Sequence, residues 1–83
     1  MKILKFYADW CSPCKTMTQV IESVKNKINV PVEEINIDSN ESLTKEYSIR
    51  GIPALIILDD SGTEIKRRVG LMSAEEFLIF VGD

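Results

Sequence analysis

Apolar residues along the chain follow patterns that predict alternating strands and helices. Two short, nearly continuous apolar runs, Ile3–Ala8 and Ala54–Leu58, are typical of strands buried on both faces. Apolar residues at three- and four-residue spacing, from Met17 to Ile28, predict an amphipathic helix over 12–28. A second strand is expected over Val32–Asp38, and a strand–helix–strand succession of this length favours parallel pairing through a crossover.

The rest of the chain predicts a short helix, a hairpin and a closing helix. The short helix is expected over 39–48, and a turn at Asp59–Gly62 leads from the apolar run at 54–58 into a half-exposed edge strand over 63–69. A capping box at Ser73–Glu76 begins the last helix. The residues on which these two helices are predicted are candidate N-caps and residues of an apolar helix face: Ser39, Asn40, Leu43, Tyr47, Phe77, Leu78 and Val81. The predicted order is β-α-β-α-β-β-α.

Length and composition indicate one folded domain over residues 1–83. The chain has 83 residues, of which 45% are apolar and 28% charged, and this composition excludes the disordered and low-complexity classes. A domain of this size can fold without covalent staples. The two cysteines are therefore not required for folding.

Charge and hydropathy exclude several classes of partner. The net charge is −3 with no His, and the one basic cluster, 66–68, is expected to be a solvated strand edge rather than a nucleic-acid surface. No run of 18 apolar residues exists, and the stretch 1–10 is interrupted by charges. Neither a membrane span nor a signal peptide is predicted. We therefore expect a reducing cytoplasm as the compartment, and no nucleic acid or membrane partner.

Two cysteines, Cys11 and Cys14, lie where the first predicted strand passes into the first predicted helix. Positions three apart on a helix lie roughly 5 Å apart at Cα, a separation that a disulfide tolerates. The free amides and positive dipole end of a helix N-terminus favour a thiolate, so we expect Cys11 to be the nucleophile. Cys14, one turn inward, is then the resolving thiol, whose attack releases the substrate and leaves Cys11 and Cys14 oxidised.

Three kinds of chemistry compete to explain this pair. A metal site would need further ligands, and with no other Cys and no His the chain offers only carboxylates or a second copy of itself. A structural disulfide would close too short a loop to constrain the unfolded chain, and a cytosol would reduce it. A C-x-x-C pair beside a βαβ pattern favours dithiol redox chemistry, which requires neither metal nor cofactor.

The segment Ala8–Lys15 resembles the active-site signature of the thioredoxin family, which usually has Gly where this chain has Ser12. Segments 35–38, 47–53 and 69–70 also resemble thioredoxin segments, so the similarity covers nearly the whole chain. The N-terminal strand and helix of full-length thioredoxins have no counterpart. The resemblance implies a minimal thioredoxin-like α/β fold, with a four-stranded mixed sheet and flanking helices.

The resemblance also implies how the site is completed. It makes Ile52–Pro53 a cis peptide beside the cysteines, although trans is the majority state of X-Pro bonds, and it assigns the Ile52 backbone to pairing with a substrate strand. In the family, a proline here also keeps metal from gathering at the two sulfurs. An apolar rim for docking protein substrates would surround Cys11. Its members are Trp10, Ile52, Gly70, Leu71 and Met72; for Met72 the alternative is a plain surface position before the helix cap.

One departure from the family pattern involves two charged residues. Thioredoxins usually place a buried Asp below the cysteines and a Lys facing it from the neighbouring strand; Lys5 and Glu34 occupy those positions here. The charges are exchanged, so an ion pair of reversed polarity is expected. Lys5 would then stabilise the Cys14 thiolate and make the protein more oxidising than a typical thioredoxin. The alternative is that Lys5 reaches water at an open end of the sheet.

Together these features indicate an enzyme that reduces protein disulfides by thioredoxin-type exchange. The resemblance implies recycling by a flavin-containing or other thioredoxin-reductase-like electron donor, and we expect a monomer. A glutathione-dependent, glutaredoxin-like enzyme is an alternative favoured by size, although 71–73 lacks the Gly-Gly and acidic residues with which glutaredoxins usually hold glutathione. A thioredoxin-fold interaction module with incidental cysteines is the alternative from another class.

Overall fold

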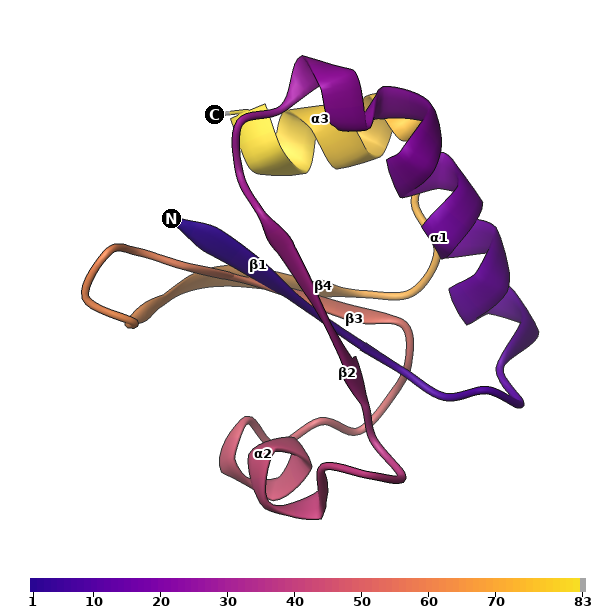
Figure 1. Cartoon of the computed structure of the whole chain (residues 1–83), viewed down its shortest axis with the longest axis vertical. Coiled ribbons are helices and arrows are strands. Elements are labelled where there is room, and N and C mark those ends of the chain that lie inside the picture. The colour runs from indigo at the N-terminus through magenta and orange to yellow at the C-terminus, as the bar shows by residue number, and fades with distance from the viewer. Residues whose placement is uncertain (83) are drawn as a thin grey trace.

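The computed structural model describes residues 1–82 and places one four-stranded sheet between helices (Figure 1). The strands are β1 (Lys2–Tyr7), β2 (Val32–Asn36), β3 (Ala54–Leu58) and β4 (Glu64–Val69), arranged in the order β2-β1-β3-β4. The helices are α1 (Ser12–Val24), α2 (Glu41–Glu46) and α3 (Ala74–Gly82), with a 3₁₀ turn at Lys25–Lys27. The mixed sheet and the predicted order of elements are confirmed.

The two continuous apolar runs form the two inner strands. β1 pairs in parallel with β2 and antiparallel with β3, while β4 pairs antiparallel with β3. A parallel pair requires a crossover, which α1 supplies between β1 and β2. Every residue of β3 is buried, because helices cover both faces of the sheet at this strand (Figure 1).

The core has two layers, one on each face of the sheet. α1 and α3 cover one face and α2 the other (Figure 1). The buried cluster under α1 and α3 contains Ile3, Met17, Ile21, Val24, Leu55, Ile57, Met72, Phe77, Phe80 and Val81. The cluster on the α2 side contains Leu4, Phe6, Ile35, Ala54, Ile56 and Leu58, with Leu43 and Tyr47 of α2 packed against it. The predicted apolar faces of the helices therefore do point to the sheet.

Several element boundaries, and one helix cap, differ from the prediction. The first helix ends at Val24 rather than Ile28, because the chain passes through the 3₁₀ turn and Ile28 is already extended (φ −122°, ψ 150°). β2 ends at Asn36, whose side chain accepts a hydrogen bond from the Asp38 N–H at 2.8 Å and turns the chain away. Asn40 is the N-cap of α2 but makes no capping bond, since its amide donates to the Asn36 carbonyl at 3.0 Å.

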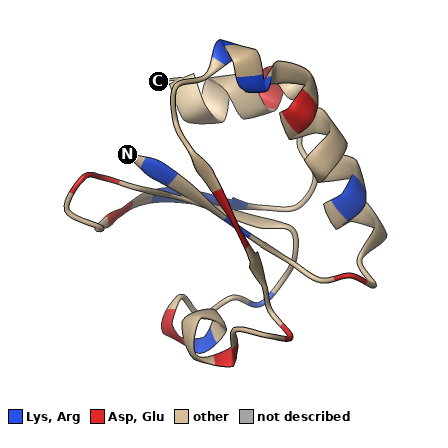
Figure 2. Cartoon of the chain, viewed as in Figure 1, with Lys and Arg blue, Asp and Glu red and all other residues tan. Residues whose placement is uncertain are grey.

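The edge strand β4 places Lys66 and Arg68 on the face of the sheet that α3 covers. Lys66 is half-buried with Nζ 5.5 Å from the centre of the Phe80 ring, and Arg68 pairs with Glu76 of α3 at 3.1 Å. Ile65 and Val69, on the opposite face, stay 52% and 53% exposed. Across residues 1–82, acidic and basic positions are interspersed over helices and strands (Figure 2). The expectation of a solvated basic strand edge is confirmed.

The hairpin between β3 and β4 is held by one aspartate. The Asp59 carboxylate accepts hydrogen bonds from the Ser61 hydroxyl at 2.7 Å and from the Ser61 and Thr63 N–H groups at 2.9 Å. The bond from the Ser61 side chain, followed by those from the backbone, holds the pKa of Asp59 below its ordinary value of 3.8. Gly62 adopts φ 87°, a conformation that favours glycine, so the predicted turn residues are used as expected.

Candidate active site

The two cysteines lie at the first turn of α1 and are joined by a disulfide, with their Cα atoms 5.3 Å apart. Cys11 is the N-cap residue in an extended conformation (φ −97°, ψ 105°), and its Sγ accepts a hydrogen bond from the Cys14 N–H at 3.1 Å. Pro13 lies in the first turn, where its missing N–H leaves no unpaired donor. Cys11 and Cys14 are 5% and 2% exposed. The helix N-terminus therefore directs a backbone donor at the sulfur of Cys11.

The Ile52–Pro53 peptide is cis, as the family resemblance implied. Pro53 is buried, and the partly buried Ile52 packs against the cluster that contains Cys11 and Cys14. Gly70, at φ 105°, donates its N–H to the Pro53 carbonyl at 2.8 Å. This bond brings the segment after β4 to the cis peptide, so the structure places Ile52, Pro53 and Gly70 together.

Two exposed apolar side chains flank this arrangement in the sequence. Trp10, next to Cys11, is 69% exposed, and its Nε1 donates to Asp38 Oδ2 at 3.0 Å. Leu71, next to Gly70, is 49% exposed. Both are free to contact another molecule, as a docking rim requires.

Met72 does not join the rim. It is only 1% exposed and belongs to the core cluster with Phe77. Ser73 is the N-cap of α3, bonded reciprocally with Glu76, so Met72 precedes the cap and Phe77 is the fourth helical residue. Apolar residues at these two positions pack together as a hydrophobic staple, a signal that the sequence already contained. The expectation that Met72 contacts substrate, and the alternative of a surface position, are both wrong.

Lys5 is completely buried on the α1 side of β1. Its Nζ lies 3.3 Å from Glu34 Oε1, donates to the Thr18 hydroxyl, and lies 5.5 Å from the centre of the Tyr7 ring. The charge-exchanged pair therefore forms, although only one partner is buried: the Glu34 side chain is 45% exposed. The alternative that Lys5 reaches water is wrong.

Thr18 is the site residue that the sequence reasoning missed. It lies one helical turn beyond Cys14, and its hydroxyl donates to the Cys14 carbonyl at 3.1 Å while accepting from Lys5. The four-residue spacing from Cys14, which places both residues on one face of a helix, was the available signal. Thr18 connects the buried ammonium of β1 to the turn that carries the second cysteine.

Within residues 1–82, no cluster of three or more His, Cys, Asp or Glu side chains is arranged to hold a metal ion. In the same part of the chain, no helix has the length and hydropathy that a bilayer crossing requires.

Comparison with known proteins gives consistent matches. The thioredoxin family model matches residues 1–82. Thioredoxin from Chlamydia trachomatis is 35% identical over 77 residues, covering 92% of this chain and 74% of the relative. A mutant thioredoxin from Halobacterium salinarum superposes with a TM-score of 0.87 at 32% identity, covering 95% of this chain and 69% of that one. Chloroplastic thioredoxin z gives a TM-score of 0.82 at 30% identity, with coverage of 96% and 74%.

Proposed function

The chain belongs to the thioredoxin family and is a protein-disulfide oxidoreductase acting through the Cys11–Cys14 pair, in which we propose that Cys11 attacks the substrate and Cys14 resolves the intermediate. The observation that carries these roles is the hydrogen bond from the Cys14 N–H to Cys11 Sγ at 3.1 Å. A backbone donor at a helix N-terminus stabilises a sulfur anion, and of the two sulfurs it is Cys11 that receives one.

The exchange proceeds in two displacements. In the reduced protein, the Cys11 thiolate attacks one sulfur of the substrate disulfide, and the other substrate sulfur leaves with the electron pair. The Cys14 thiolate then attacks Cys11 in the mixed disulfide, forms the Cys11–Cys14 bond and expels the second substrate sulfur as a thiolate. The substrate gains two electrons and the protein loses two.

Docking of protein substrates is proposed for the surface formed by Trp10, Ile52, Gly70 and Leu71. The exposure of Trp10 and Leu71 supports it, since apolar side chains left at 69% and 49% exposure favour contact with a partner. None of the backbone hydrogen bonds outside the helices and strands of residues 1–82 involves Ile52. Its backbone groups are therefore available to an extended substrate segment, the pairing that the family resemblance assigns to it.

The family implies protein disulfides as substrates and a reductase as the partner that renews the dithiol. Within that frame we propose a flavin-containing reductase as the donor, a monomeric protein, and a cytoplasmic setting, because a disulfide reductase needs a reducing supply. Capture with Cys14→Ser, which stalls the mixed disulfide at Cys11, would recover both the substrates and the donor from a native extract.

Insulin reduction by dithiothreitol tests the activity. The native protein should accelerate the precipitation of reduced insulin chains, and Cys11→Ser should remove the acceleration. Ser12→Gly, which introduces the residue that the family usually has, serves as a matched control and should keep it. Equal precipitation rates with the native protein and Cys11→Ser would contradict the proposed role of Cys11 and favour a module without redox activity.

A further inference from the structure

A small cavity lies beside the resolving cysteine. Its volume is about 140 Å³, and its walls include Cys14, Thr18 and Glu34 together with Asp9 and Lys15. Liquid water occupies roughly 30 Å³ per molecule, so the cavity has room for several waters, and its polar walls offer them hydrogen-bond partners. Cys14 is only 2% exposed on the protein surface. Water in this cavity is therefore the available route for a proton between Cys14 and the solvent.

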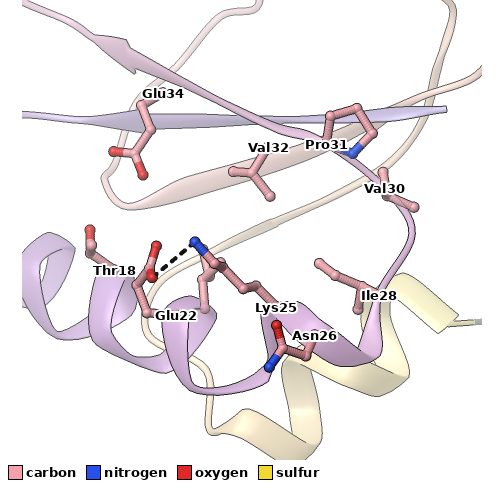
Figure 3. Close-up of a pocket in the computed structure, with 10 residues that line it drawn as sticks. Thr18, Glu22, Lys25, Asn26, Ile28, Val30, Pro31, Val32 and Glu34 are labelled. Atoms are coloured by element: carbon pink, nitrogen blue, oxygen red, sulfur yellow. Dashed lines mark ion pairs between the residues drawn. The ribbon is translucent and has the colours of Figure 1, made fainter.

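Glu34 stands between this cavity and a second, wider one. The second cavity, of about 380 Å³, lies between α1 and the start of β2, and Thr18 and Glu34 line both. Figure 3 shows the Glu34 side chain directed from β2 toward Thr18. With a side chain 45% exposed, Glu34 can exchange protons with bulk water while facing the cavity that borders Cys14.

Lys5 fixes the position of this carboxylate. Its Nζ lies 3.3 Å and 3.5 Å from the two Glu34 oxygens, and burial among β1, α1 and β2 leaves the ammonium no water as a substitute partner. An ammonium has donors but no acceptor, so Lys5 itself cannot take the Cys14 proton. Asp9, the other carboxylate at the cavity, is exposed, and no hydrogen bond or ion pair within residues 1–82 holds it.

From this geometry we infer that Glu34, oriented by Lys5, is the proton acceptor for Cys14 during resolution of the mixed disulfide. The inference rests on the proposed roles of the two cysteines. Water in the cavity relays the Cys14 proton to the Glu34 carboxylate, which becomes a carboxylic acid. The Cys14 thiolate attacks Cys11, the Cys11–substrate bond breaks, and the substrate sulfur departs with the electron pair. Glu34 then loses the proton to solvent. Lys5 is a positioning residue in this step.

The two displacements can be observed separately with a bis(nitrobenzoate) disulfide, which releases a coloured thiolate at each one. In stopped-flow mixing with the reduced protein, attack by Cys11 gives a first phase proportional to reagent concentration, and attack by Cys14 gives a second phase independent of it. Glu34→Gln should slow the second phase roughly tenfold or more and leave the first within about twofold, because a positioned general base typically contributes ~10²–10⁴ in rate.

Matched variants separate a proton-transfer role from a structural one. Glu33→Gln, at the exposed neighbour of Glu34, and Asp9→Asn should leave both phases within about twofold of the native protein. Glu34→Ala should regain the second phase as acetate is added, since the small carboxylate can occupy the vacated space. If loss of the counter-charge of Lys5 destabilises Glu34→Gln, the double variant Lys5→Met/Glu34→Gln removes the buried charge and should still resolve the mixed disulfide slowly.

The outcomes are distinct. A second phase unchanged in Glu34→Gln, a second phase slowed equally by Asp9→Asn, or no response of Glu34→Ala to acetate would each overturn the role of Glu34. Failure of the proposed cysteine roles has another signature, namely loss of the concentration-dependent first phase in Cys14→Ser, which keeps Cys11 as the only thiol.

Discussion

Lys5 and Glu34 lie opposite each other on the parallel strands β1 and β2, and the ammonium of one is 3.3 Å from the carboxylate of the other. Lys5 is fully buried while the Glu34 side chain is 45% exposed, so the pair connects the interior below the cysteines to the solvent. Its polarity is the reverse of the arrangement usual in the family. Removing each partner should therefore have different consequences.

Lys5→Met should make the protein more reducing. A buried positive charge near α1 stabilises thiolates, and hence the dithiol form, so its removal should lower the reduction potential. One modest charge contact of about 1.4 kcal/mol corresponds to about 30 mV for two electrons. Equilibration against a glutathione buffer measures the shift. Lys2→Met is the control, because Lys2 makes an exposed ion pair with Glu33 on the same two strands at 2.8 Å. An unchanged potential in Lys5→Met would exclude an electrostatic role for Lys5.

Two substitutions of Lys5 should separate the contribution of its charge to the free energy of unfolding from the contribution of its packing. Lys5→Met replaces a buried ammonium with an apolar chain of similar length and leaves Glu34 able to take up water, so stability should be unchanged or raised by about 1–2 kcal/mol. Lys5→Ala empties the site and should lower stability by about 2–3 kcal/mol. Urea unfolding of the reduced proteins provides both values. A Met variant as unstable as the Ala variant would show that the ion pair itself stabilises the fold.

Leu71 and Met72 are adjacent residues with opposite environments. Met72→Ala should lower the free energy of unfolding by about 2–4 kcal/mol, because it opens a cavity beside Phe77. Leu71→Ala, at a position 49% exposed, should change stability by less than about 0.5 kcal/mol.

In insulin reduction, Leu71→Ala should raise KM with little effect on kcat, as expected for a docking contact. If KM stays unchanged, Leu71 is not part of the docking surface.

Glu76 should contribute to stability at neutral pH and lose that contribution in acid. The Ser73 backbone N–H, followed by Arg68, holds the pKa of the Glu76 carboxyl below its ordinary value of 4.5. A group whose pKa is lowered by folding stabilises the native state above its unfolded pKa, and the stabilisation disappears as pH falls through the folded pKa. Glu76→Gln should therefore be less stable than the native protein at neutral pH and equally stable well below pH 4.5. Thermal unfolding of both proteins at neutral and at acidic pH is the measurement. A difference in stability that persists in acid would contradict a stabilising role of the ionised Glu76 carboxylate.

Alkylation should distinguish the two cysteines of the reduced protein. Cys11 receives the Cys14 N–H at the start of α1, so iodoacetamide should modify Cys11 at least about tenfold faster than Cys14 at neutral pH. Peptide mass mapping after brief exposure gives the ratio. Equal modification of both cysteines would contradict the assignment of Cys11 as the attacking thiol.

The fold was largely predictable because local patterns and long-range packing agree in this chain. The run Ala54–Leu58 is apolar throughout and forms a strand buried throughout, and Ser73 and Glu76 form the reciprocal cap that their spacing indicated. The cis peptide at Ile52–Pro53 was predictable only from family resemblance, since trans is the ordinary state of such bonds.

The features that were not predicted depend on local hydrogen bonding and on the position of each strand in the sheet. Asn40 bonds back to Asn36 instead of capping α2, and the chain leaves the first helix before Ile28. Lys5 and Glu34 are unequally buried because β1 is an inner strand and β2 is an edge strand. The sequence predicted that the two charges would pair, but not that β2 would lie at the edge.

The Thr18 hydroxyl has one hydrogen, and its neighbours determine where that hydrogen points. Because Lys5 occupies it as an acceptor, the hydrogen is directed to the Cys14 carbonyl. Thr18 thus links strand β1 to the first turn of α1 through two hydrogen bonds. A valine of the same shape would remove one of the two polar partners of the Lys5 ammonium, which would keep only Glu34, and would also remove the side-chain donor to the Cys14 carbonyl. Thr18→Val should therefore loosen the turn that holds Cys14 without changing either cysteine.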